Sequence, residues 1–248
     1  LPGGAQARAG AGAVTGRYDL HIHSCLSPCG DEEMTPNNIV GMAQVLELQI
    51  LAVSDHNTAR QLPAVEKLCK EAGILFVPAI EISTAEEAHI LSLFPDVQSA
   101  LAMGEEVYDA LPPVKNKPEI FGNQFILDEN DEKVGELEKL LINATTLPIG
   151  EVFKRVRARG GVPVPAHIDK NSYSVISSLG MIPPELGVRA VEVSDSGVKK
   201  GYRPPEEGYF VLNDSDAHCL DVMCGHEAGE IELERWSVRA LLELLRGG

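Results

Sequence analysis

The histidines of this chain are concentrated at the ends of short apolar runs, and this placement is the strongest constraint on the fold. Between Asp19 and His23 polar and apolar residues alternate, so a strand there would present its polar side chains on one face. His21 and His23 would then lie about 7 Å apart along the strand and could close on one metal ion. Such pairs also occur as hydrogen-bonded core histidines, but four other histidines also lie at the end of a short apolar run or just after one. They are His56, His89, His167 and His218.

Short β-like runs alternate with helical segments along most of the chain, and polar residues follow most of these runs. The runs are residues 50–53, 74–82, 88–94, 162–166, 188–193 and 209–212. This alternation predicts an α/β fold in which crossover helices join parallel strands. Because the carboxyl ends of parallel strands meet at one face, a closed or nearly closed (β/α) barrel would bring the polar residues together.

One domain is expected over residues 17–248, after a flexible Ala/Gly-rich tail at 1–16. The alternation breaks at about 96–148, which is interpreted as an insertion. Within it, two β-like runs around the acidic residues 128–131 predict a hairpin. Eleven acidic residues and three lysines between residues 96 and 138 give a net charge of −8, half of the chain's −16. Such an insertion is expected to be a functional flap or an assembly surface, through which the chain could form a homo-oligomer.

The net charge of −16 argues against a groove that binds nucleic acid by neutralising phosphates. The expected partner is therefore a small phosphorylated substrate, and stable binding of a long nucleic acid is not expected. No apolar run approaches 18 residues, so no membrane span is expected. Five cysteines, an odd number, fit free thiols in the reducing cytoplasm better than a disulfide framework.

Candidate metal ligands accumulate on the face where the strands would end. They are His21, His23, Asp55, His56, Glu81, His89, His167, Asp216 and His218. Imidazoles with a few carboxylates suit zinc, iron or manganese better than calcium or magnesium, which prefer oxygen ligands. Nine donors exceed what one tetrahedral ion needs, so two or three divalent ions are expected.

The order and context of these residues resemble the polymerase and histidinol phosphatase (PHP) superfamily. Five motifs carry the resemblance: Asp19-Leu-His-Ile-His23, Ser54-Asp55-His56, Glu81-Ile with a downstream His89-Ile-Leu, Pro165-Ala-His167, and Asp214-Ser-Asp216-Ala-His218. The resemblance runs from Tyr18 to about Leu245, apart from the insertion. It implies an α/β fold of the distorted (β/α)7, TIM-like barrel type with a trinuclear metal centre.

The resemblance also implies a ligand set for each ion. His21, His23, Glu81 and Asp216 would hold the first ion. Glu81 would bridge to a second ion held by His89 and His167. His56 and His218 would hold the third, with Cys29 at a position where many members have a histidine. A thiolate can replace an imidazole on zinc, so Cys29 is a candidate ligand, whereas Asp55 is expected to orient a ligand imidazole.

A metal-dependent phosphoesterase is the expected enzyme, cleaving a phosphomonoester or a small nucleotide phosphodiester by a metal-bound hydroxide. The expected catalytic residues are His21, Glu81, Asp216 and His218, and Lys170 and Arg203 are candidates for binding the substrate phosphate. Two alternatives stay open. A metal-dependent amidohydrolase also begins with His-x-His, although it usually relies on a bridging lysine, and the metals could instead support a binding module without turnover.

Overall fold

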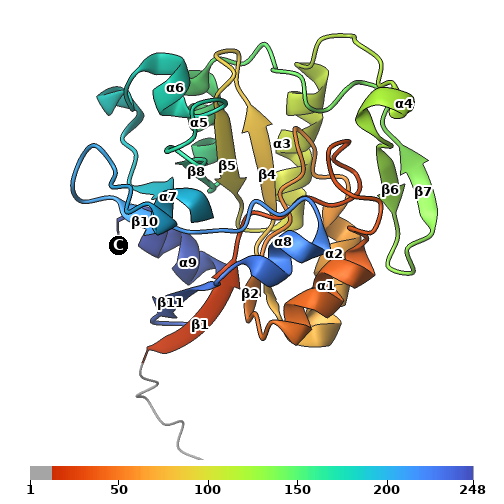
Figure 1. The fold of residues 1–248 in the computed structure, drawn as a ribbon, viewed down its shortest axis with the longest axis horizontal. Coiled ribbons are helices and arrows are strands. Elements are labelled where there is room, and N and C mark those ends of the chain that lie inside the picture. The colour runs from red at the N-terminus through yellow and green to blue at the C-terminus, as the bar shows by residue number, and fades with distance from the viewer. Residues whose placement is uncertain (1–12, 248) are drawn as a thin grey trace, which may run out of the picture.

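The computed structural model describes residues 13–247, which form a mixed α/β fold (Figure 1). Its four-stranded sheet has the order β11–β1–β2–β3, with β1 at Val14–Asp19, β2 at Ile50–Leu51, β3 at Leu75–Phe76 and β11 at Gly229–Leu233. The pairs β1–β2 and β2–β3 are parallel, and β1–β11 is antiparallel. Strand β1 therefore begins inside the range expected for the tail, and residues 1–12 lie outside the described part.

Two further sheets contain strands that include or precede candidate ligands. One has the order β4–β5–β8, with β4 at Ala79–Ser83, β5 at His89–Leu93 and β8 at Val162–Pro165. The other pairs β9 (Ala190–Glu192) with β10 (Phe210–Leu212) in parallel. Single backbone hydrogen bonds join neighbouring sheets, such as the one from Ile168 N to Glu192 O at 2.9 Å.

The described strands do not form the mostly parallel, closed barrel that was expected. Within residues 13–247 they make four separate sheets, and β5 is antiparallel to both β4 and β8. The physical reason is the short connection between β4 and β5, which turns through Thr84 and Ala88 with a backbone hydrogen bond of 2.9 Å. A parallel pair needs a crossover of a dozen or more residues, so this turn allows only an antiparallel pair.

Helices pack around the strands and share the apolar core with them. Their bounds are α1 Pro36–Val45, α2 Leu62–Ala72, α3 Val97–Asp109, α4 Pro118–Phe121, α5 Ile149–Ala158, α6 Val175–Leu179, α7 Asp195–Lys199, α8 Leu220–Gly225 and α9 Val238–Leu245, with a 3-10 helix at Pro184–Leu186. Figure 1 places α1, α2 and α3 on one side of β4 and β5, with α5 and α9 on the other side. Helix α1 begins as the sequence predicts, because the Thr35 side chain caps it and Pro36 is its first residue.

Helix α3 occupies the first part of the segment interpreted as an insertion. Asp96 caps this helix through the backbone N–H of Ser99 at 2.7 Å, and Val97, Ala100 and Met103 are buried in the main core. Its apolar residues recur at helical spacing, so the helix belongs with the core. The irregular part is residues 111–147, which we call the flap.

The flap contains the predicted hairpin, formed by β6 (Phe125–Leu127) and β7 (Lys133–Glu136). The hairpin is antiparallel and its turn carries Asp128, Glu129 and Asp131, as the sequence predicts. Gln61 on the body of the protein fixes it by donating to Leu127 O at 2.7 Å. No helix within residues 13–247 is long and apolar enough to cross a membrane.

Candidate metal centre

Most candidate ligands lie just beyond the ends of strands, whereas Glu81 lies within β4 and His89 begins β5. His21 and His23 follow β1, and His56 follows β2 and makes a bridge with Glu81 on β4. His167 and Asp216 have positive φ angles of 32° and 50°, which L residues rarely adopt. The chain therefore turns sharply after β8 and β10, and a strained backbone of this kind is concentrated at functional sites.

Glu81 lies at the centre of the histidine cluster and is only 1% exposed. Its carboxylate oxygens lie within 3.3 Å of ring nitrogens of His21, His23, His56, His89 and His167. The shortest distances are 2.8 Å to His89 Nδ1 and 2.9 Å to His56 Nδ1. Ligand atoms that share one ion at about 2.0–2.2 Å are roughly 3 Å apart, so this spacing fits shared metal ions.

Asp216 and His218, which follow β10, complete the cluster. Asp216 Oδ1 lies 3.5 Å from His21 Nε2 and 3.3 Å from His23 Nε2. The His218 ring stacks on that of His23 with centroids 4.1 Å apart. The backbone places both residues, because His23 N donates to Ala217 O at 2.9 Å.

Three groups of side chains bring their ligand atoms within 4.8 Å of one another. They are His23 with His56 and His218, His21 with His23 and Glu81, and His56 with Glu81 and His89. Within the described residues, His167 Nδ1 is buried without a hydrogen-bond partner, and His56 Nδ1 and Glu81 Oε2 are buried 2.9 Å apart without the geometry of a hydrogen bond. Buried polar atoms are normally paired, so these atoms fit a centre that is completed by metal ions.

Electrostatics keeps the carboxylates of the cluster ionised, and these carboxylates outweigh burial and raise the pKa of the His23 and His56 imidazoles to about 9. Burial disfavours the charged form of Glu81, yet the surrounding imidazoles, His89 first, hold the pKa of its carboxyl well below the usual range. The pKa of Asp216 is also held well below its usual range, because His21 and its neighbours outweigh burial. Burial and a neighbouring imidazole lower the pKa of His218 to about 3. Ionised carboxylates and a neutral imidazole are the forms that bind metal.

Glu192 contacts the cluster from β9 and was not expected from the sequence. It is fully buried, and its Oε2 lies 2.9 Å from His21 Nδ1 and accepts from the His167 backbone N–H at 3.3 Å. The sequence signal is an acid inside the apolar run 188–193. A carboxylate in a fully buried strand is rare unless it is paired.

Asp55 also acts from outside the cluster, as the sequence predicts. Its Oδ1 accepts from the Ser27 hydroxyl at 2.7 Å and from the Ser24 backbone N–H at 2.8 Å. The Ser27 hydroxyl lies 3.1 Å from His23 Nδ1. Asp55 and Ser27 therefore fix the orientation of the His23 ring.

The three remaining candidates differ in position. Cys29 is exposed and close enough to His56 to contribute, after Glu81, to the raised pKa of that imidazole, but it is in none of the three groups of ligand atoms. Lys170 Nζ lies 2.6 Å from Asp216 Oδ2. Arg203 is exposed and is not among the residues described as lining the cavity at the cluster. The structure therefore brings Lys170 into the cavity at the cluster, places Cys29 near His56, and leaves Arg203 away from the cavity.

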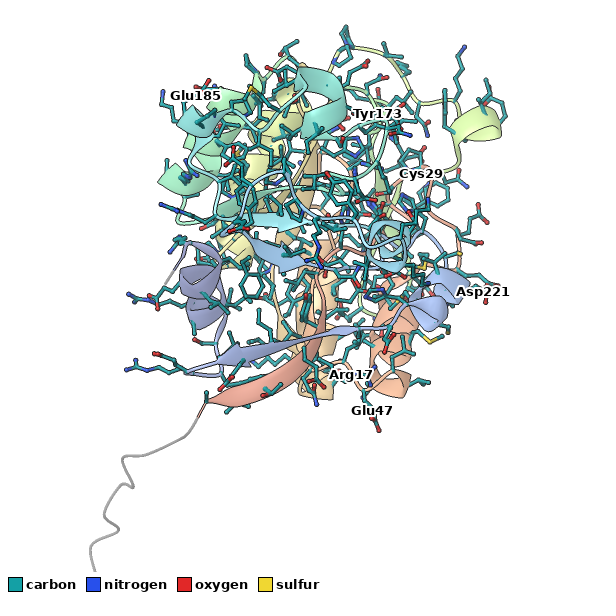
Figure 2. All side chains as sticks on the ribbon, turned by 60° about the vertical axis from the view of Figure 1, so that its left-hand side comes forward. Arg17, Cys29, Glu47, Tyr173, Glu185 and Asp221 are labelled. Carbon is teal, nitrogen blue, oxygen red and sulfur yellow. The ribbon has the colours of Figure 1, made fainter. Side chains whose placement is uncertain are left out.

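An open cavity of about 310 Å³ leads to the cluster. It is lined by His56, Glu81, His89, Ile142, His167, Lys170, Ser172, Tyr173, Asp216 and His218. Figure 2 shows Tyr173 and Cys29 in the upper half of the molecule, far from Arg17 and Glu47 at its base. A ligand can therefore reach the cluster from the face where the strands end.

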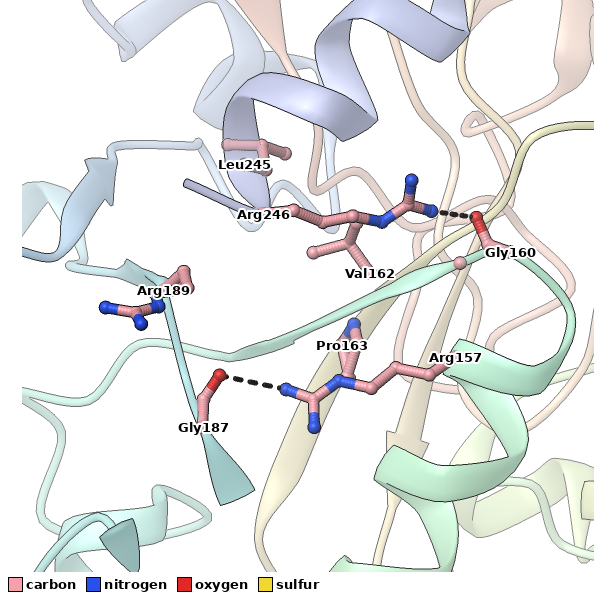
Figure 3. Close-up of a pocket in the computed structure, with 9 residues that line it drawn as sticks. Arg157, Gly160, Val162, Pro163, Gly187, Arg189, Leu245 and Arg246 are labelled. Carbon is pink, nitrogen blue, oxygen red and sulfur yellow. Dashed lines mark hydrogen bonds between the residues drawn. The ribbon is translucent and has the colours of Figure 1, made fainter. Parts of the chain in front are cut away.

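A second cavity, of about 530 Å³, lies at the beginning of β8 (Figure 3). Arg157, Arg189 and Arg246 surround it, and none of its lining residues is a candidate metal ligand. Arg157 donates to Gly187 O at 3.0 Å, and Arg246 donates to Gly160 O. Two of the three guanidinium groups thus tie neighbouring loops together, at the end of the strand opposite to His167.

Comparison with known proteins supports the resemblance. The PHP domain family model matches residues 19–158, more than half of the chain. A 5′-3′ exoribonuclease of Haemophilus influenzae is 36% identical over 83 residues, which cover 32% of this chain and 29% of that protein. An uncharacterized protein of Methanocaldococcus jannaschii is 34% identical over 101 residues, which cover 37% of this chain and 58% of that protein. The chain thus spans less than two thirds of either relative.

Solved structures share the fold. The lesion-specific endonuclease PfuEndoQ of Pyrococcus furiosus matches with a TM-score of 0.65 at 19% identity, over 94% of this chain and 56% of that chain. Endonuclease Q in complex with a 27-mer duplex that carries an abasic lesion matches with a TM-score of 0.60 at 15% identity, over 94% of this chain and 57% of that chain. At these identities the likeness is one of fold.

These relatives contradict the expectation that the partner is a small phosphorylated substrate and that nucleic acid does not bind stably. The exoribonuclease and endonuclease Q are named for acting on nucleic acids, and endonuclease Q binds a DNA duplex. The expectation was wrong because it used the net charge of −16, which sums over the whole surface. Bound divalent cations are often the largest charges at a site and can reverse its local field.

Proposed function

Because this chain belongs to the PHP domain family, we propose that it is a metal-dependent hydrolase that cleaves phosphodiester bonds in nucleic acid. The observation that carries the proposal is the buried carboxylate of Glu81, surrounded by five imidazoles beside an open cavity. The nuclease names of the relatives support the choice of substrate.

Two or three divalent ions of zinc, manganese or iron would be held by the cluster. His21, His23, Glu81 and Asp216 would form one ligand set, and Glu81, His89 and His167 a second. His56 and His218 would form a third, which His23 or Cys29 could complete. Bound ions would supply Lewis acidity and lower the pKa of a water ligand.

Lys170 is the residue proposed to bind a phosphate oxygen. Its ammonium group lines the cavity and lies 2.6 Å from Asp216 Oδ2. A lysine has three N–H donors, so two remain for substrate oxygens. Asp216 thereby holds the cation in place and orients it toward the phosphate.

The strands are proposed to enclose the centre as an irregular version of the expected barrel. Parallel ladders join β1, β2 and β3, and the chain continues from β3 through Val77 and Pro78 into β4. Antiparallel ladders join β4, β5 and β8, and β9 pairs with β10. Bonds between single residues, such as the bridge of Ile22 with Ala217, support contact between the remaining edges.

A cleavage assay with the full chain tests the proposed function. The chain is loaded with Mn²⁺ or Zn²⁺ and incubated with end-labelled oligoribonucleotides and oligodeoxynucleotides, and with amide substrates for comparison. We expect metal-dependent cleavage of an oligonucleotide and at least a 100-fold lower rate for Glu81→Gln, since Glu81 belongs to two ligand sets. The matched control is Glu232→Gln, an exposed acid on β11. Turnover of amides alone would support an amidohydrolase and contradict the proposal.

A further inference from the structure

A smaller hollow of about 230 Å³ adjoins the metal-centre cavity. The two share His89, Ile142 and Tyr173 as lining residues. The flap forms one wall of the hollow, and the lining residues not shared with the metal-centre cavity are Ser83, Glu87, Phe121, Leu140, Asn143 and Ala144. A group bound in the hollow could therefore belong to the same molecule as a phosphate bound at the metal centre.

Two polar groups of this hollow have no partner among residues 13–247. Ser83 Oγ and Asn143 Nδ2 are both buried without a hydrogen bond, and Ser83 is only 2% exposed. Their backbones are fixed, because Ser83 N donates to Asn57 Oδ1 at 2.9 Å and Asn57 Nδ2 donates to Asn143 O at 3.0 Å. Buried polar atoms that the fold holds in place but leaves unpaired indicate a ligand that pairs them.

Tyr173 supplies an aromatic face between the two cavities. Its ring stacks on that of His89, with centroids 5.0 Å apart and an angle of 22° between the planes, and the side chain is 55% exposed. The residue has a positive φ of 57°, which is strained for a side chain of this size, and its backbone O accepts from His89 N at 2.9 Å. One face of the ring is thus occupied by His89, and the exposed part remains available to a ligand.

We propose that this hollow is a nucleobase subsite. It binds the base of the nucleotide next to the scissile phosphate. This base stacks on Tyr173, and its polar edge forms hydrogen bonds with Asn143 and Ser83. The inference rests on the proposed function, and it follows because unpaired bases are recognised by aromatic stacking together with hydrogen bonds to their edges. The flap residues Phe121 and Leu140 would cover the base and exclude water.

Equilibrium binding tests the subsite without turnover. Non-hydrolysable 5′-phosphonate analogues of the four ribonucleosides are titrated into the metal-loaded chain, with the base-free ribose analogue as the reference. We expect at least one base to tighten binding about 5- to 100-fold, the range that one base stack provides. Tyr173→Ala should abolish this gain and Tyr173→Phe should keep most of it. Asn143→Ala should reduce the gain and change the preference among bases.

The matched control is Val134→Ala, an exposed flap position on β7 that leaves the gain unchanged. Equal affinity for ligands with and without a base, including equal absence of binding, would overturn the subsite. An equal loss for both ligands in Tyr173→Ala would assign Tyr173 to holding His89 and would also overturn it. Base-dependent binding without any oligonucleotide cleavage would keep the subsite and reject the proposed hydrolysis.

Discussion

Glu192 Oε2 lies 2.9 Å from Nδ1 of His21, and both side chains are completely buried. The contact fixes the ring so that the other nitrogen, Nε2, faces Glu81 at 3.3 Å. Carboxylates that bind the far nitrogen of a ligand histidine set its tautomer and raise its basicity. Glu192 would therefore act on the proposed metal centre through His21.

Glu192→Gln is expected to weaken metal binding about 10- to 100-fold, the usual effect of removing such a partner. The substitution preserves the size of the side chain, so the fold should remain intact. Competition with a fluorescent chelator measures the affinity, and Glu232→Gln serves as the control. Unchanged affinity would show that His21 needs no carboxylate for its orientation.

Lys170→Met should lower kcat/KM for an oligonucleotide by about tenfold or more, because it removes a cation from the cavity without touching the histidines. Metal content should stay at the wild-type value, and Lys170→Arg should restore part of the activity. The control is Lys199→Met, an exposed lysine on α7. A loss of metal in Lys170→Met would instead assign the lysine to organising Asp216.

The cysteines are expected to differ in reactivity. Burial raises the pKa of the Cys69 thiol to about 12, and burial together with the Asp55 carboxylate raises that of Cys25 to about 12. At pH 8 only about one in ten thousand of these thiols is ionised, so iodoacetamide should spare both in the native protein. The exposed Cys29 and Cys224 should react, as mass spectrometry of the peptides can show.

The same labelling tests Cys29 as a ligand. If its thiolate completes the third ligand set, Zn²⁺ should slow alkylation of Cys29 at least tenfold and leave Cys224 unchanged. Equal rates with and without Zn²⁺ would exclude Cys29 from the centre.

Asp131 fastens the hairpin of the flap to the beginning of α1. Its carboxylate accepts from Thr35 Oγ1 at 2.8 Å and from Asn37 Nδ2 at 3.0 Å. Asp131→Asn removes one acceptor and the negative charge near the helix N-terminus, so the free energy of unfolding should fall by about 1 kcal/mol. Urea denaturation measures the change against Glu119→Gln, an exposed acid of the same flap. An equal effect of both substitutions would contradict this role.

The sequence predicted which residues gather in one cluster better than it predicted the sheets. His21, His23 and Glu81 could be placed because polar residues at strand ends follow from local alternation. The antiparallel direction of β5 depends on the length of the turn before it. The segment 84–88 is too short for the crossover of a parallel pair, so its length could have predicted this direction. Helix α3 was missed although its apolar residues have helical spacing, because the acidic residues around it dominated the interpretation.

Two features of the centre depend on contacts that local patterns do not contain. Glu192 reaches His21 across 171 positions of the chain, and the Ser27 hydroxyl beside His23 donates to Asp55, 28 positions away. The class of partner was misjudged for a similar reason, since net charge is a property of the whole chain and substrate binding is local.

Elemental analysis of the purified chain after dialysis, with wild type and Glu81→Gln measured in parallel, tests the metal centre most directly. We expect two or three equivalents of zinc, manganese or iron per wild-type chain and the loss of at least one equivalent in Glu81→Gln. Less than one equivalent in the wild type, or the same content in both proteins after reconstitution, would contradict a metal centre built on Glu81.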